Sequence, residues 1–197
     1  MKPLPIGILG SGKGSNCQAI LERIRSGDLA AEARVVISDV LDAPILEIAR
    51  EFSVANAYLA PGQFRTRLEP EAENGLVNML REAGVDLVIL VGFMRVLHAP
   101  MLKAFPGRII NIHPSLLPKF PGLEAWKQAL DAGETVTGCT VHYVDEKIDH
   151  GDIIAQRDVP ILPNDTAESL HARIQVTEHE LYPAVIAKIC RESDRQP

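Results

Sequence analysis

The chain has 197 residues, of which 46% are hydrophobic and 23% are charged. This length and composition fit one globular domain with a sizeable core, so we expect a single domain over residues 1–197. A net charge of −6 and an aromatic content of 5% argue against a nucleic-acid-binding protein, which would need a basic surface and stacking side chains.

The cysteines and histidines argue against several kinds of site. The three cysteines are widely separated and form no CxxC motif, so we expect neither a disulfide framework nor a zinc site, and a cytoplasmic location is the simplest. The six histidines form no HExxH motif, so we expect no metal. The N-terminal apolar run leads directly into a glycine loop, which favours a strand over a signal peptide. No stretch approaches the roughly 20 apolar residues of a membrane span.

The first elements are a strand, a glycine loop and a helix. Leu4 to Leu9 is typical of a buried strand, and a helical pattern begins after the loop GSGKGSN, which runs from Gly10 to Asn16. Glycines allow a ligand to approach the backbone, and a helix N-terminus offers unpaired N–H groups, so the loop indicates a phosphate site. Its spacing matches neither GxGxxG nor a P-loop, which weakens dinucleotide and ATP interpretations. The alternative is a tight turn with a capping serine.

The following elements alternate between strands and helices. We expect a strand at Val35–Ser38, a helix at Pro44–Phe52, a strand at Ala57–Leu59 and a helical stretch at Gln63–Ala83 that Pro70 interrupts or restarts. This alternation predicts an α/β, Rossmann-like fold with a mostly parallel sheet and helices on both faces. Arg65 and Arg67 lie at the start of the last stretch, where the pattern alone indicates solvated surface charges.

A central strand is expected at Val85–Val91, because its apolar run is nearly uninterrupted, as in a parallel strand buried on both faces. The apolar character continues past Gly92 through Phe93 to Leu97. That segment either lines a pocket for a flat heterocycle, read by backbone groups, or packs beneath the next helix, expected at Pro100–Phe105.

The next strand, Arg108–Ile112, is stopped by Pro114, so His113 should lie at its carboxyl end, the edge where open α/β sheets bind ligands. Asn111 and His113 are two residues apart on an extended segment, so their side chains should share a face. An amide donor beside an imidazole suits a developing oxyanion. The alternative is a turn-capping asparagine and a hydrogen-bonded core histidine.

The C-terminal part of the chain is expected to contain antiparallel rather than parallel strands. After a helix at Glu124–Ala132, the strands Thr137–Val144 and Ile153–Val159 are joined by a loop too short for a parallel crossover, so we expect an antiparallel pair. The acidic loop between them contains Asp149. The last helix should run from Thr166 to about Ile189, with Asp165 as N-cap, Glu168 completing a capping box and Pro183 producing a kink.

Taken together, GSGKGSN, GFMRVL, NIHPSLLPKFPG, TGCTVHYVDEKIDHGDII and the terminal helix resemble the folate-dependent phosphoribosylglycinamide formyltransferases over nearly the whole chain. NIHPSLLP is specific to the wider group that uses formyltetrahydrofolate, and SGxGSN favours the glycinamide ribonucleotide enzymes. The resemblance implies the formyltransferase fold and transfer of a formyl group from 10-formyltetrahydrofolate to the amine of glycinamide ribonucleotide in purine synthesis.

The resemblance also implies residue roles. The implied catalytic residues are Asn111, His113 and Asp149; the nucleotide residues are Gly14, Ser15, Asn16 and Glu178; the folate residues are Arg67, Met94, Arg95, Val96, Leu97 and Asn111. The chain departs from many bacterial members at Glu124-Ala125-Trp126, where they carry histidines.

A carboxylate near His113 would favour the protonated imidazole, which gives Asp149 a role in the reaction without any metal.

Two kinds of alternative function remain open. The nearest alternatives are a formyltetrahydrofolate hydrolase or a methionyl-tRNA formyltransferase, which carry an additional domain. A non-catalytic sensor that binds a sugar phosphate through the Gly10–Asn16 loop is an alternative from another class. The sequence leaves the oligomeric state open.

Overall fold

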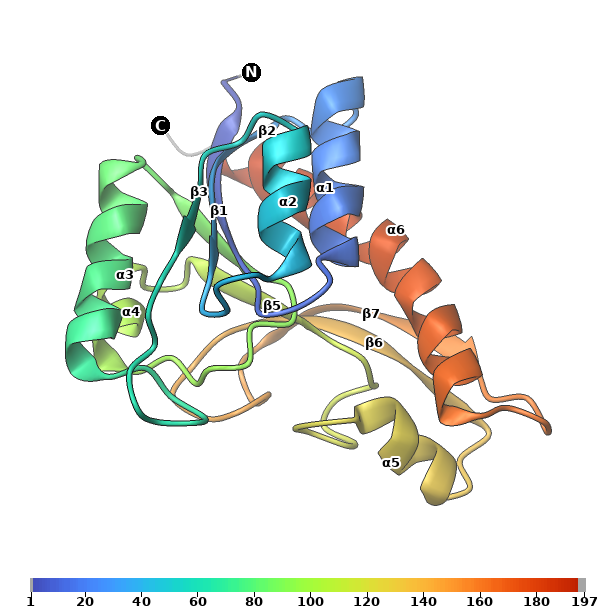
Figure 1. Cartoon of the computed structure of the whole chain (residues 1–197). Helices are drawn as coiled ribbons and strands as arrows, with labels where there is room; N and C mark the ends of the chain where they lie inside the picture. The colour runs from blue at the N-terminus through green and yellow to red at the C-terminus, as the bar shows by residue number, and fades with distance from the viewer. Residues whose placement is uncertain (1, 195–197) are drawn as a thin grey trace.

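Seven strands form one sheet with helices on both sides in the computed structural model, which describes residues 2–194 (Figure 1). The strands are β1 (Leu4–Leu9), β2 (Ala31–Ser38), β3 (Asn56–Tyr58), β4 (Leu87–Leu90), β5 (Ile109–His113), β6 (Val136–Tyr143) and β7 (Ile153–Pro160). The helices are α1 (Ser15–Ser26), α2 (Pro44–Glu51), α3 (Pro70–Glu82), α4 (Ala99–Ala104), α5 (Ala125–Asp131) and α6 (Ala167–Ser193).

The strand order is β3-β2-β1-β4-β5-β6-β7. The first five strands pair in parallel, whereas β6 runs antiparallel to both β5 and β7. The expected α/β fold with an antiparallel C-terminal pair is therefore confirmed. The order reverses between β1 and β4, and such a switch point opens a ligand crevice at the carboxyl ends of the strands.

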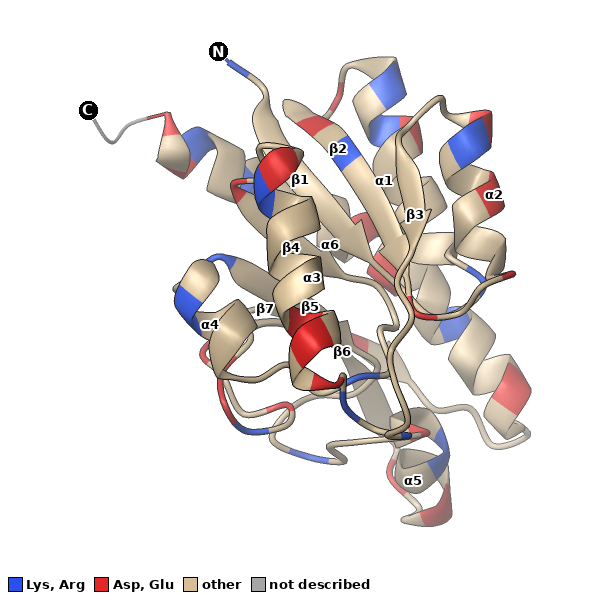
Figure 2. Cartoon of the chain, turned by 60° about the vertical axis from the view of Figure 1, so that its left-hand side comes forward, with Lys and Arg blue, Asp and Glu red and all other residues tan. Residues whose placement is uncertain are grey.

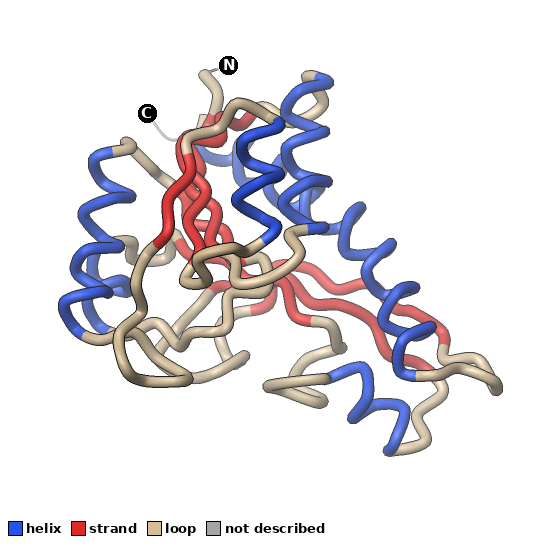
Figure 3. Tube along the Cα trace, in the orientation of Figure 1, coloured by secondary structure: helices blue, strands red, loops and turns tan. Residues whose placement is uncertain are grey.

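The helices divide the core into two layers, one on each face of the sheet (Figure 3). One layer packs α1, α2 and α6 against the sheet, and the other packs α3 and α4. Strands β1 and β4 are buried along their whole length, as their apolar runs predict. Within residues 2–194, no helix combines the length and apolar character needed to cross a membrane.

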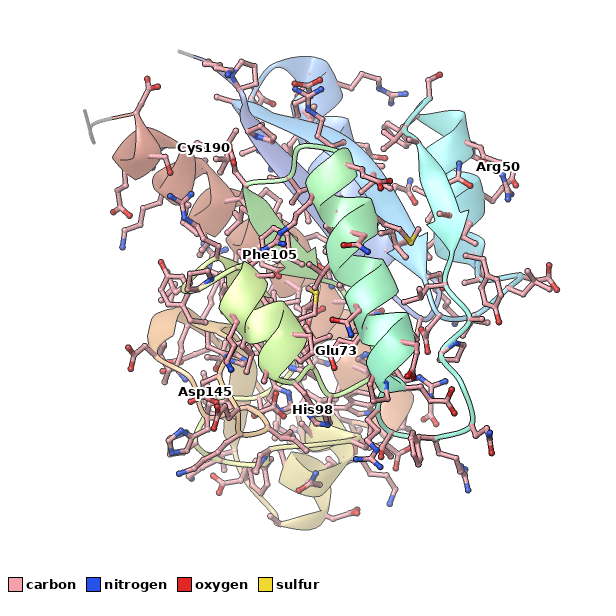
Figure 4. The ribbon with its side chains drawn as sticks, turned by 90° about the vertical axis from the view of Figure 1, so that its left-hand side faces the viewer. Arg50, Glu73, His98, Phe105, Asp145 and Cys190 are labelled. Carbon is pink, nitrogen blue, oxygen red and sulfur yellow. The ribbon has the colours of Figure 1, made fainter. Side chains whose placement is uncertain are left out.

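Helices α3 and α4 are joined through a buried carboxylate. Glu73 is 2% exposed, and its Oε1 accepts a hydrogen bond of 2.6 Å from the backbone N–H of His98, the residue before α4 (Figure 4). Glu71 and Glu73 both lie in the first turn of α3, the end of a helix that favours acidic residues, and Figure 2 shows acidic residues in red at this end of α3.

Two helix starts were predicted wrongly, and α6 ends at Ser193, four residues beyond the predicted Ile189. Residues 63–69 are not helical, because α3 begins at Pro70 after Glu69, whose ψ of 152° is extended. The N-cap of α6 is Thr166, which forms a capping box with Ser169 and not with Glu168. Asp165 instead accepts hydrogen bonds from Leu162, Ser169 and Arg173.

Tyr182 of α6 connects two central strands. Its side chain is fully buried, and its hydroxyl lies 3.0 Å from the carbonyl oxygens of both Leu90 in β4 and Ile110 in β5. The neighbouring Pro183 lies inside α6, as expected. The last helix is thereby fixed to the strands that carry the candidate site.

Replacing Tyr182 by phenylalanine should lower the free energy of unfolding by about 1–3 kcal/mol, because it removes the hydroxyl that reaches both carbonyls from α6. Urea denaturation measures the effect. Tyr58→Phe is the control, since Tyr58 lies on the edge strand β3 and is 42% exposed. Equal stability of the two variants would contradict a contribution from the buried hydroxyl.

Candidate active site

The candidate site lies at the carboxyl edge of the sheet, where β1, β4 and β5 end in loops. The glycine loop after β1 and the segment after β4 touch here, because Ser11 N–H donates to the Gly92 carbonyl at 3.1 Å. His113 is the last residue of the adjacent strand β5. The sheet therefore brings three of the sequence's functional segments to one edge.

His113 and Asp149 meet as expected. Asp149 comes from the loop between β6 and β7, and its Oδ2 lies 3.3 Å from Nδ1 of His113. The imidazole side chain is 5% exposed and the carboxylate 10% exposed. The Gly122 N–H donates to the same Oδ2 at 2.8 Å. Burial alone would raise the pKa of Asp149, but its contacts with His142, His113 and Gly122 together hold that pKa below its ordinary value.

Both ring nitrogens of His113 face acceptors. Nε2 lies 2.8 Å from the Phe120 carbonyl oxygen, which can only accept, so Nε2 carries a proton. Burial lowers the pKa of His113, while the Asp149 carboxylate and the Phe120 carbonyl act in the opposite direction. Burial therefore favours the neutral ring, whereas the Asp149 carboxylate favours a second proton on Nδ1, the nitrogen that faces it.

His142 is a site residue that the sequence analysis missed. It lies directly opposite Asn111 in the β5–β6 ladder. Its Nδ1 donates to the Tyr143 carbonyl at 2.8 Å, so Nε2 is left to accept from the amide of Asn111 at 3.3 Å. The same Nε2 is 3.7 Å from Asp149 Oδ1. The β5–β6 register is what brings this histidine to the site, and the local patterns used in the sequence analysis did not assign that register.

The glycine loop begins α1 in a form that suits an anion. Gly14 is the N-cap with φ of 77°, a left-handed conformation that glycine adopts readily, and no side chain caps the helix. The first N–H groups, beginning with Ser15, therefore lack intrahelical partners. A side chain at Gly14 would place Cβ 2.8 Å from Ile45 Cγ1, so the loop packs tightly on α2.

The loop also meets the last helix. Asn16 Nδ2 donates to Glu178 Oε2 at 2.8 Å, across 162 residues of chain. Glu178 is 5% exposed, and burial raises its pKa, opposed by the Asn16 amide. The buried Oδ1 of Asn16 has no hydrogen-bond partner within residues 2–194. Such an acceptor fits a ligand that brings its own donor.

The residues assigned to folate lie side by side on two loops. Arg67 pairs with Val96 in an isolated parallel bridge, supported by the Val96 N–H, which donates to the Thr66 carbonyl at 2.8 Å. Met94 is 54% exposed, whereas Leu97 is buried. The guanidinium of Arg67 is exposed and stacks on the Phe64 ring at 3.9 Å.

Arg95 differs from Arg67 because its guanidinium is turned into the protein. Its Nε donates to Asp39 Oδ2 at 2.6 Å, and its Nη1 donates to the carbonyls of Phe64 and Arg65. The side chain thus holds loops together, and what this position offers a ligand is its backbone.

Trp126, at the departure from the family pattern, stacks on His171 of α6. The two ring centroids are 3.7 Å apart and the planes differ by 2°. Burial lowers the pKa of His171, and the Lys13 charge lowers it further. The stack therefore lies within electrostatic reach of the glycine loop. Among residues 2–194, no group of three or more His, Cys, Asp and Glu side chains is arranged to hold a metal ion.

Comparison with known proteins matches residues 5–186 to the sequence model of the formyl transferase family. The chain belongs to this family. It is 39% identical over 188 residues to phosphoribosylglycinamide formyltransferase of Bacillus subtilis, covering 95% of each chain. It is 46% identical over 184 residues to the trifunctional purine biosynthetic protein adenosine-3 of Drosophila pseudoobscura, and spans only 13% of that relative's length.

Solved structures agree with this assignment. Glycinamide ribonucleotide transformylase 1 from Symbiobacterium toebii superposes with a TM-score of 0.92 at 47% identity, covering 97% of this chain and 89% of that one. Phosphoribosylglycinamide formyltransferase from Bacillus halodurans gives a TM-score of 0.91 at 40% identity, covering 98% of each chain. The resemblance inferred from the sequence is confirmed, and membership of an enzyme family favours an enzyme over a phosphate sensor.

His113 should titrate below pH 6.5 in this formyl transferase, and Asp149→Asn should lower its pKa further by removing the opposing charge. Since folding favours the neutral ring, the fold should lose stability as the pH falls through 6.5 toward the folded-state pKa. NMR titration of the imidazole measures the shift. Asp145→Asn is the control in the same loop, since Asp145 contacts His150. An unchanged His113 pKa in Asp149→Asn would contradict the pairing.

Proposed function

We propose that this protein transfers the formyl group of 10-formyltetrahydrofolate to the amine of glycinamide ribonucleotide in purine biosynthesis. The observation that carries the proposal is the group of Asn111, His113 and Asp149 at the carboxyl edge of the sheet, in which the buried His113 lies against Asp149 and His142 lies between Asp149 and Asn111. The names and full-length similarity of the relatives support the same substrates. The reaction takes place in the cytoplasm, needs no metal and involves no nucleic acid or membrane partner.

The reaction requires stabilisation of one negative oxygen. The substrate amine attacks the formyl carbon, a new C–N bond forms, and the bond from that carbon to the folate nitrogen breaks. The proton lost by the amine ends on the folate nitrogen. Charge develops on the formyl oxygen, where donors fixed in advance lower the barrier. Asn111 and His113 are these donors.

The present contacts of His113 indicate how the formyl oxygen is received. Nε2 donates to the Phe120 carbonyl, an acceptor of the same kind as a formyl oxygen. The substrate oxygen replaces this carbonyl, while the Asn111 amide turns from His142. Asp149 keeps the imidazole proton available and holds a water that relays the amine proton.

The two substrates occupy the two sides of this group. The phosphate of glycinamide ribonucleotide binds at Gly14 and Ser15, and Asn16 and Glu178 accept from its sugar hydroxyls. The folate lies against Arg67 and the Met94–Leu97 backbone, with its formyl group toward Asn111.

The direct test is turnover. Incubating the protein with both substrates and following the folate absorbance should show formation of tetrahydrofolate that depends on glycinamide ribonucleotide. Consumption of formyltetrahydrofolate without the nucleotide would indicate a hydrolase, and absence of any reaction would reject the proposed activity.

Asn111→Ala and His113→Ala should each reduce kcat by about 10²–10³-fold with substrate binding retained, as for loss of an oxyanion donor. Steady-state kinetics measures the losses. Asn74→Ala is the control, because Asn74 is exposed on α3. The double variant His113→Ala/Asp149→Asn should lose less than the product of the single losses, since groups acting together are non-additive. Near-parental turnover in the single variants would reject these catalytic roles.

The dephosphorylated nucleoside should bind much more weakly than glycinamide ribonucleotide. Losing the phosphate removes several charge-assisted hydrogen bonds at the start of α1, each worth roughly 1.5–3 kcal/mol. Isothermal titration calorimetry compares the two affinities. Equal affinities would reject the glycine loop as the phosphate site.

A further inference from the structure

We propose that Asp39 is a positioning residue that couples the two substrate-binding segments, so that occupation of one substrate site favours binding at the other. The proposal rests on the function proposed above. Asp39 follows β2 directly, and its buried carboxylate contacts Ser11 and Arg95, neither of which is among the proposed catalytic side chains. No reaction step assigned above uses it.

The first oxygen of Asp39 fixes the glycine loop. Oδ1 accepts from the Ser11 hydroxyl at 2.5 Å, and the same hydroxyl oxygen accepts from the Met94 N–H at 2.8 Å. Since Ser11 N–H also donates to the Gly92 carbonyl, Ser11 is bonded to the folate segment at two points. The Ser11 hydroxyl therefore links the loop that carries Gly14 to the Met94 backbone by a hydrogen bond.

The second oxygen of Asp39 fixes the folate side. Oδ2 accepts from Arg95 Nε at 2.6 Å, and the Nη1 of Arg95 donates to the carbonyls of Phe64 and, at 2.7 Å, Arg65. These carbonyls belong to the loop that carries Arg67. One carboxylate thus connects all three ligand-facing segments, each of which starts from a different strand or helix.

Burial makes this connection stiff. The Asp39 side chain is 1% exposed and that of Arg95 15% exposed, so water competes little for their hydrogen bonds. The planar guanidinium fixes the direction of its donors, which a lysine ammonium would not do. A displacement of Ser11 on nucleotide binding is therefore transmitted to the Met94 backbone and to the Phe64–Arg65 loop.

A purely structural role and a coupling role differ in what they predict. A structural residue would lower stability or both affinities while leaving each affinity independent of the other substrate. A coupling residue sets the factor by which one substrate changes the affinity for the other, and linkage makes that factor the same in both directions. The factor can be measured without turnover by using tetrahydrofolate, which has no formyl group to transfer.

The experiment measures tetrahydrofolate affinity by calorimetry with and without saturating glycinamide ribonucleotide. In the parent protein the nucleotide should tighten binding by about 5–150-fold, the usual range of coupling between sites. In Asp39→Asn the factor should fall toward one, because the two bonds end on different oxygens of the carboxylate and an amide replaces one of these acceptors by an NH₂ donor. The control Asp42→Asn, an exposed carboxylate in the same loop, should retain the parental factor.

Two further variants keep the test decisive if Asp39→Asn folds poorly. Ser11→Ala breaks the glycine-loop side and Arg95→Lys breaks the folate side, so either should also reduce the factor. A parental factor of one, or a factor unchanged in these folded variants, would overturn the coupling role. An active parent enzyme with such a result would reject this inference alone, whereas an inactive parent would reject the proposed function itself.

Discussion

The contact between a buried imidazole and a buried carboxylate constrains the rest of the site. An ion removed from water is costly unless charges or hydrogen bonds compensate it. Asp149 is compensated by the Gly122 N–H, which donates to its Oδ2, and by His113, whose Nδ1 faces the same oxygen. This requirement explains why the proline-containing loop after His113 folds back over the site. It brings the Gly122 donor and the Phe120 acceptor to opposite sides of the pair.

The sheet topology supplies the other constraint. Parallel strands place their carboxyl ends at one edge, and the reversal of order at β1 and β4 separates the loops that follow them. The antiparallel strand β6 then brings His142 beside Asn111 and returns the chain through the loop that carries Asp149. A fully parallel sheet would require a crossover helix at that point, and the carboxylate could not arrive directly from a short loop.

Local signals in the sequence predicted most of the fold and part of the site. The strand-loop-helix at Gly10–Asn16, the position of His113 and the antiparallel pair follow from patterns of a few residues, and the structure confirms them. The roles given to individual residues by resemblance stay proposals. Residues 63–69 were misjudged because their helical composition does not show that Thr66 and Arg67 pair with Val96 in the segment after β4.

The sequence analysis missed or misassigned several residues for the same physical reason. His142 acts through cross-strand register, and Asp39 acts through partners 28 and 56 positions away. Thr166 replaced Asp165 as the cap of α6 because Arg173 recruits the aspartate. In each case the deciding partner is distant or competes with a local pattern, so no window of neighbouring residues contains the information.

Arg67 and Arg95 illustrate how far a residue's type determines its role. Both are assigned to the same substrate by resemblance, yet one guanidinium is exposed over Phe64 and the other is bound to Asp39 and two carbonyls. A guanidinium already paired with a carboxylate has little charge left to attract an anion, whereas the exposed one keeps both its charge and its N–H donors. Within the proposed function, electrostatic attraction for the folate therefore belongs to Arg67. Arg95 contributes by holding in place the backbone that the folate meets. The same residue type therefore raises the affinity for the folate at position 67 and fixes the shape of its binding site at position 95.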